Sequence, residues 1–312
     1  MATKNRTFYA YKIVNETVSH ATSGLRNDLQ QKLTSAYDNF GNRCKPIADG
    51  SPVEDVLACY IPLAQTPDGI SGEMWRIAPS EDMPKIPREL FAQAEVKAED
   101  VPDDPNVSPT DKSRLDLHYF LISDDILISS FPPSRSVAFA KYLNELLTIY
   151  RGGRVYKFDP LVILPADIKL SDISSVTFSD KPILENGKIK SGKSKFGIFK
   201  TGGLVLKNMF DDYGNTNDLI NQKILSATMT LKLSKPRKMS DEVYQQKLSA
   251  ILKPLAAGDA EGVTFKLKDG KEIKAMTIQA KMHHTFNDDD ATTKDNVKNA
   301  YAVMSNYLTS LR

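Results

Sequence analysis

Apolar and polar residues alternate most regularly between Lys223 and Pro236. One parity of this stretch is apolar and the other carries hydroxyl and lysine side chains, which is the period of a half-buried strand. Ser240 then stands as a predicted helix N-cap, and apolar residues recur at helical spacing as far as Gly258. The pattern therefore predicts a strand followed by one amphipathic helix.

A second alternating stretch follows that helix. Val263, Phe265 and Leu267 alternate with polar residues, Asp269 and Gly270 offer a tight turn, and a further strand is expected from Lys271 to Met282. With Asp269 and Gly270 as the two central turn residues, Lys268 lies opposite Lys271. Like charges placed opposite each other cost stability, and a bound polyanion would relieve that repulsion.

The remaining elements are predicted by the same two periods. Strands are expected over 7–14, 56–64, 74–78, 115–122, 126–131, 155–164 and 173–178, and helices over 25–37, 88–96, 136–147, 204–210 and 297–311. The segment 181–201 is rich in Lys, Gly and Ser and is interpreted as a loop or flexible arm. The sequence thus predicts an α+β fold with antiparallel sheets and packed helices.

The last helix has one apolar face, which we expect to return to the N-terminal half of the chain. Residues 1–165 and 286–312 would then form a composite core domain, with 166–285 as an inserted basic domain. A chain of 312 residues is long enough for two such domains, each with its own core.

Composition narrows the class of protein. The chain is 41% hydrophobic and 26% charged, which is typical of a globular protein. Its two cysteines, Cys44 and Cys59, form no disulfide framework and have no zinc-site spacing, so a cytoplasmic location is expected. We find no signal peptide and no apolar run long enough to insert directly into a membrane.

Positive charge is concentrated late in the chain. Between Lys181 and Lys281 there are nineteen Lys or Arg residues against ten Asp or Glu, whereas the whole chain carries only +2. Such segregation is typical of proteins that bind a phosphate backbone, although solvated lysines on a sheet face are the simpler reading of each single residue. The candidate phosphate contacts are Lys266, Lys268, Lys271 and Lys274, a second patch of Lys232, Lys235, Arg237 and Lys238, and a supplementary set of Lys188, Lys190, Lys193 and Lys195.

Candidate catalytic chemistry is sparse. The sequence lacks the hydrolase elbow, the phosphate-binding loop and the zinc-protease motif, and the adjacent His283 and His284 point to opposite faces of a predicted strand. The strongest enzymatic alternative is a metal-dependent nuclease, with Glu272 and Lys274 on one strand face and Asp259 or Asp269 as the second carboxylate. We expect a protein without catalytic residues, metal or cofactor.

Several segments resemble the RexA family of phage exclusion proteins. The similarity is distributed over FYAYKIVN, HYFLISDDILISSFPPS, RGGRVYKFDPLV, NDLINQKILSATMTLKL, VTFKLKDGKEI and the closing helix, and covers about three quarters of the chain. The family's basic pair falls on Lys266 and Lys268.

The resemblance implies a non-enzymatic cytoplasmic homodimer that binds duplex DNA with little sequence preference and acts in superinfection exclusion or abortive infection. It makes 166–285 the expected domain for DNA binding and dimerisation. It also implies a RexB-like membrane-protein partner, phage regulatory proteins as further partners, and a fold related to RdgC. A protein-interaction module that does not bind DNA is a second alternative to this function, beside the nuclease.

Overall fold

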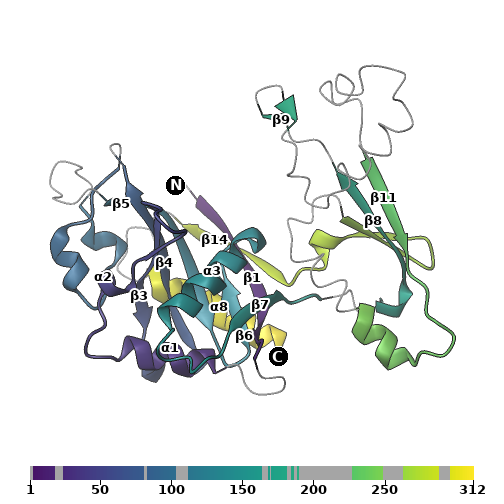
Figure 1. The fold of residues 1–312 in the computed structure, drawn as a ribbon, viewed down its shortest axis with the longest axis horizontal. Helices are drawn as coiled ribbons and strands as arrows, with labels where there is room; N and C mark the ends of the chain where they lie inside the picture. The colour runs from purple at the N-terminus through teal and green to yellow at the C-terminus, as the bar shows by residue number, and fades with distance from the viewer. Residues whose placement is uncertain are drawn as a thin grey trace. The chain divides into compact units, whose positions relative to one another are not determined.

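The computed structural model describes residues 3–17, 24–80, 83–102, 112–163, 168, 170–180, 184–185, 188–189, 227–248, 263–287 and 296–312 (Figure 1). The chain divides into two compact units. Unit 1 comprises Met1–Leu161 and Ala280–Arg312, and unit 2 comprises Val162–Gln279. Both contain antiparallel sheets with packed helices, so the fold belongs to the α+β class. Its relation to RdgC stays a prediction.

Unit 1 is built on an eight-stranded antiparallel sheet in the order β14-β1-β6-β5-β4-β3-β2, with β7 also pairing with β1. The strands are β1 (Thr3–Asn15), β2 (Lys45–Pro46), β3 (Glu54–Ile61), β4 (Ile70–Pro79), β5 (Lys112–Ile122), β6 (Ile126–Ser129), β7 (Tyr156–Pro160) and β14 (Lys281–Asn287). Strand β1 lies near the N-terminus and β14 near the C-terminus, and the two strands pair with each other. Thr3 lies opposite Asn287, and Tyr9 lies opposite Lys281.

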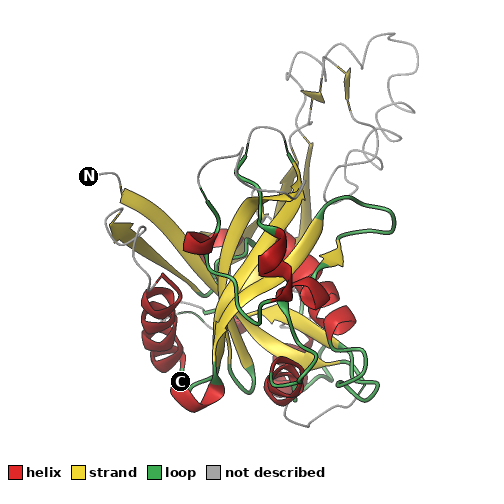
Figure 2. Ribbon diagram, turned by 90° about the vertical axis from the view of Figure 1, so that its left-hand side faces the viewer, coloured by secondary structure: helices red, strands yellow, loops and turns green. Residues whose placement is uncertain are grey.

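Helices cover both faces of this sheet, and Figure 2 shows them in red on either side of the strands. The helical elements of unit 1 are α1 (Leu25–Leu33), α2 (Phe40–Arg43), η1 (Leu63–Gln65), η2 (Arg88–Ala92), η3 (Ala98–Asp100), α3 (Pro133–Leu146) and α8 (Asn296–Leu311). Helices α1 and α3 pack on the face that includes Tyr11 and Phe120, whereas α8 packs on the face that includes Phe8 and Leu121. Alternate residues of one strand therefore enter different cores. No helix in the described ranges is long and apolar enough to cross a membrane.

Unit 2 contains a four-stranded antiparallel sheet in the order β11-β8-β12-β13 and a separate two-stranded ladder, β9–β10. The elements are η4 (Leu170–Asp172), β8 (Ile173–Asp180), β9 (Leu184–Glu185), β10 (Lys188–Ile189), β11 (Ala227–Lys232), β12 (Val263–Leu267), β13 (Glu272–Lys274) and η5 (Ala275–Thr277), with a helical segment over 241–248. Its core gathers Val176, Val263, Phe265, Ala275 and Ile278.

The chain passes between the units twice, and the two passages are adjacent. In unit 1, the amide N–H of Ala280 donates to the carbonyl oxygen of Leu161 at 2.9 Å. In unit 2, Val162 bridges Gln279, and the N–H of Ile163 donates to the carbonyl of Ile278 at 2.8 Å. The units divide after Leu161 and before Ala280, whereas the sequence predicts boundaries after 165 and before 286. The second boundary lies earlier because β14 belongs to the sheet of unit 1.

Several predicted elements differ in extent from the observed ones. The expected strand from Lys271 to Met282 is interrupted by η5, because Ala275 and Ile278 are both fully buried three residues apart, a spacing that a 3₁₀ turn satisfies and a strand does not. The helix expected over 25–37 ends at Leu33, and that over 88–96 is the short η2. Part of the expected arm forms the β9–β10 ladder. The predicted helix over 204–210 lies outside the described residues.

Candidate nucleic-acid interface

The four-stranded sheet of unit 2 has one apolar and one polar face. Val263, Phe265 and Leu267 of β12 are buried in the core of the unit, and Lys266 between them is exposed. This follows from strand geometry, because neighbouring side chains point to opposite faces. The polar face therefore carries the even-numbered residues of β12 and the residues aligned with them on neighbouring strands.

The strand registers place these polar residues in two transverse rows. The first row runs Lys232, Ser175, Lys266 and Glu272, across β11, β8, β12 and β13 in that order. The second row runs Thr230, Thr177, Thr264 and Lys274 across the same strands. We name the surface formed by these eight residues the Lys–hydroxyl face.

The three lysines of this face are available to a ligand. Lys232, Lys266 and Lys274 are exposed, and in the described part of the chain no carboxylate forms an ion pair with any of them. Glu272 is the one acidic member of the two rows, so three positive charges stand against one negative charge. Ser175 is buried at 7% exposure, so the hydroxyls that this face presents are those of Thr177, Thr230 and Thr264. The hydroxyls of Thr177 and Thr230 lie 3.1 Å apart in a hydrogen bond.

The β12–β13 turn differs from the predicted one. Lys266 lies opposite Glu272 and Phe265 opposite Ile273, and the N–H of Leu267 donates to the carbonyl of Lys271 at 2.8 Å. The loop thus contains three residues, with Gly270 at a φ of 89°, where a side chain would be strained. The predicted pairing of Lys268 with Lys271 is wrong. The observed register is favoured because it places Ile273 beside Phe265 in the core.

This register separates the four lysines of the first predicted patch. Lys266 and Lys274 lie on the Lys–hydroxyl face. Lys271 aligns with a residue of the apolar face, and its Nζ lies 3.4 Å from a carboxylate oxygen of Asp269. Lys268 is exposed in the turn, where its N–H donates to the carbonyl of Asp172 at 2.8 Å.

The second predicted patch is also divided. Lys232 joins the first row, whereas the Nζ of Lys235 contacts Asp241 at 2.6 Å and thereby lowers the pKa of that carboxyl. Arg237 and Lys238 are exposed in the turn before the helical segment. Of the supplementary lysines, Lys188 begins the short strand β10, and Lys190, Lys193 and Lys195 lie outside the described residues.

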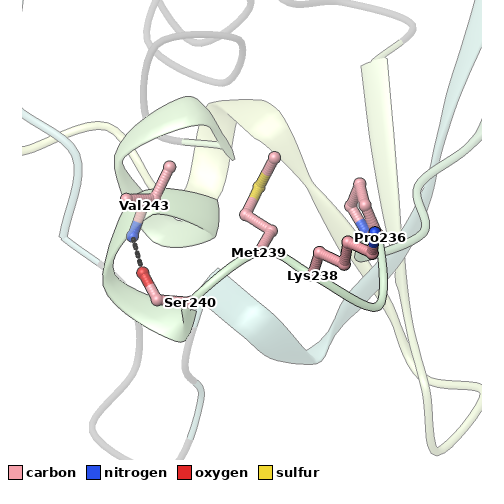
Figure 3. Close-up of a pocket in the computed structure, with 5 residues that line it drawn as sticks. All are labelled: Pro236, Lys238, Met239, Ser240 and Val243. Carbon is pink, nitrogen blue, oxygen red and sulfur yellow. Dashed lines mark hydrogen bonds between the residues drawn. The ribbon is translucent and has the colours of Figure 1, made fainter.

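A shallow open hollow lies where this turn meets the helical segment (Figure 3). Ser240 caps the segment as predicted, because its Oγ accepts a hydrogen bond from the N–H of Val243 at 3.4 Å. The lining residues are Pro236, Lys238, Met239, Ser240 and Val243. Lys238 is the one charged side chain in this lining, which contains no acid–base pair. The lining therefore gives no support for a catalytic role of the hollow.

The nuclease alternative needs converging carboxylates. Glu272 and Lys274 share the polar face, but the carboxylate of Asp269 accepts the N–H of Lys271 at 3.0 Å within the turn. Asp259 lies outside the described residues. Across the described ranges, no three His, Cys, Asp or Glu side chains are grouped so that they could hold a metal ion.

A polar cluster among the described residues of unit 1 includes His118. His118 Nε2 lies 3.1 Å from Asp116 and 2.9 Å from Arg135, and its ring stacks on Phe131. Burial lowers the pKa of His118, which favours the neutral ring. Burial is the largest single influence on the pKa of Asp116 and acts to raise it, but the hydrogen bonds and nearby positive charges, led by the hydrogen bond from Arg135, together outweigh burial and lower that pKa. The cluster joins β5 to α3, and His283 and His284 lie elsewhere on opposite faces of β14.

The phosphate contacts predicted from the sequence are all lysine or arginine side chains, and the hydroxyls of the Lys–hydroxyl face are not among them. The signal was present as the alternation Thr228, Thr230, Lys232 and as Ser175 and Thr177 two residues apart. Comparison with known proteins adds no family to these observations, since no family model matches the chain. No curated protein matches it significantly either. The resemblance to RexA therefore stays a prediction.

Proposed function

We propose that this chain is a non-enzymatic protein that binds duplex DNA along its phosphate backbone, through the Lys–hydroxyl face and with little sequence preference. The observation that supports the proposal is the register that aligns Lys232, Ser175 and Lys266 in one row and Thr230, Thr177, Thr264 and Lys274 in the next. Lysine ammonium groups and Ser or Thr hydroxyls are common donors to phosphate oxygens.

The shape of the surface favours backbone contacts over base contacts. A sheet face of four strands is about 14 Å wide, since neighbouring strands lie about 4.8 Å apart. Its hydroxyls are short and fixed on the strands, whereas base reading in a groove requires a protruding helix, ribbon or arm. Each lysine that neutralises a phosphate releases condensed counterions, so affinity would come from salt-dependent contacts that every sequence offers alike.

The biological setting that we propose follows from the resemblance to the RexA family. The chain would act as a homodimer in phage superinfection exclusion or abortive infection, beside a membrane-protein partner. The exposed lysines of unit 2 fit this role, because a protein that must act on any incoming DNA gains from contacts that are independent of sequence.

The test is binding of the full chain to two fluorescent duplexes of equal length and unrelated sequence, at several salt concentrations. We expect equal affinities that fall together as salt rises. A large preference for one duplex would overturn backbone recognition, and binding that ignores salt, or no binding, would support a protein-interaction module. Incubation of plasmid with Mg²⁺ or Mn²⁺, with and without chelator, tests the nuclease, and plasmid cleavage would overturn the non-enzymatic assignment.

A further inference from the structure

Strand β11 forms one edge of the four-stranded sheet (Figure 1). It pairs with β8 from Ala227 to Lys232, and among the described residues no strand pairs with its other side. An unpaired edge presents a row of backbone donors and acceptors that can template another strand.

The register identifies which backbone groups face outward. The N–H of Leu233 donates to the carbonyl of Ser174 at 2.7 Å, so Leu233 forms a hydrogen-bonded pair across β8. Hydrogen-bonded and non-hydrogen-bonded pairs alternate in an antiparallel ladder. Leu231 is therefore also bonded to β8, and residues 228, 230 and 232 direct their N–H and C=O groups away from it.

These outward groups are symmetric about Thr230. We propose that β11 of a second copy of this chain adds antiparallel to β11, with Thr230 opposite Thr230 of the second copy. Residue 228 then lies opposite Lys232 of the second copy, and each outward N–H meets an outward carbonyl. In this register, residues of equal parity lie opposite each other, so the polar sides of the two sheets lie on the same side of the joined sheet. Lys232 does not lie opposite another lysine, so no like charges are placed opposite each other.

Exposure of Leu231 supports this docking. Its side chain belongs to the apolar side of the sheet, yet it is 46% exposed. An added strand would lie alongside it and remove apolar surface from water. Neither proline nor glycine occurs between Ala227 and Lys232 to disfavour pairing at this edge.

The inference deepens the homodimer in the proposed function and rests on it for its biological purpose. Two joined sheets would form one eight-stranded sheet about 34 Å wide, given strand spacings of about 4.8 Å. The Lys–hydroxyl faces of both copies would be continuous, which doubles the exposed lysines from three to six. Such a face would follow about one turn of duplex, since B-DNA rises about 3.4 Å per base pair.

The experiment compares the solution mass of the full chain with that of Thr230→Pro by sedimentation equilibrium. Proline removes the outward N–H of residue 230 without removing a bond to β8, and Thr230→Val is the matched control that keeps this N–H. We expect a dimer for the wild type and the valine variant, and a monomer for the proline variant at the same concentration. A monomeric wild type, or a proline variant that remains dimeric, would overturn the inference.

A second variant tests the docking without relying on the proline variant, whose dimer could also be lost by misfolding. Thr230→Cys should be joined to its counterpart in a second copy by a short bis-maleimide, whereas Thr264→Cys on β12 should not, because about five strand spacings would separate it from its counterpart. The wild type, with Cys44 and Cys59, gives the background. Absence of the crosslink at residue 230 overturns the inference.

These outcomes are independent of DNA binding. Lys266→Ala with Lys274→Ala leaves β11 unchanged, so this double variant should remain a dimer while losing affinity for duplex. A dimer through residue 230 that binds no DNA would contradict the proposed function alone. DNA binding by a proline variant that remains dimeric would contradict the docking alone.

Discussion

Replacing the three lysines of the Lys–hydroxyl face separates the contribution of this face from that of net charge. Lys232→Ala, Lys266→Ala and Lys274→Ala remove every positive side chain in the two rows. For duplex DNA, each phosphate contact contributes about 0.9 to the slope of log affinity against log salt. Three contacts per chain thus contribute about 2.7 to the slope, or an affinity loss of about 40-fold between 50 and 200 mM salt.

The assay is fluorescence anisotropy of a labelled random-sequence duplex titrated with the full chain at four salt concentrations. The triple variant should lose about 2.7 units of slope per chain and bind more weakly at every salt concentration. Lys271→Ala is the matched single-charge control, to be compared with Lys266→Ala. Lys271 lies near Asp269 and aligns with the apolar face, whereas Lys266 lies in the first row.

The two single variants should differ in their salt dependence. Lys266→Ala should lower the slope by about 0.9, and Lys271→Ala should leave it close to the wild-type value. Equal effects of the two substitutions would mean that charge acts through the whole domain and not through the rows. An unchanged slope in the triple variant would refute the assignment of the face.

Three further predictions concern stability and are checked by denaturant unfolding of the full chain. Phe265→Ala should destabilise unit 2 by about 3–5 kcal/mol, because its ring is buried in the core beneath the face; unchanged stability would contradict that placement. Gly72→Ala should destabilise unit 1 by about 1–3 kcal/mol, since a Cβ there would lie 2.6 Å from the carbonyl oxygen of Cys59 and 2.8 Å from the ring of Phe120. Burial raises the pKa of Glu73 above its ordinary 4.5, so its stability contribution is full below that value and is lost as pH rises through the raised pKa. Glu73→Gln should therefore gain stability relative to the wild type as the pH rises above 4.5, and a pH-independent difference would refute this.

The hydrophobic pattern predicts most of the elements, but the register that it implies across the β12–β13 turn depends on which residues form the turn. Asp269 and Gly270 suit a two-residue turn and also the end of a three-residue loop. Only the second choice places Ile273 on the same face as Phe265. The decisive signal was therefore the parity of both arms taken together, because a shift of one residue moves a strand's side chains to the other face.

Two other features depend on contacts that are distant in sequence. The alignment of Lys232 with Lys266 requires β8 between their strands, and no local pattern predicts which strand separates two others. The interruption of the strand at η5 is predictable from the sequence, because Ala275 and Ile278 are spaced as in a helical turn. The closing helix was predicted well, since its apolar stripe is long and regular.

The hydrogen bond between Ala280 and Leu161 holds together the two points at which the chain enters and leaves unit 2. Its two attachment points are 2.9 Å apart, donor to acceptor, so the excision of residues 162–279 leaves a gap that a short reverse turn can close. The whole basic module could then be transplanted into another scaffold at a comparable β-hairpin, or expressed as a minimal fragment.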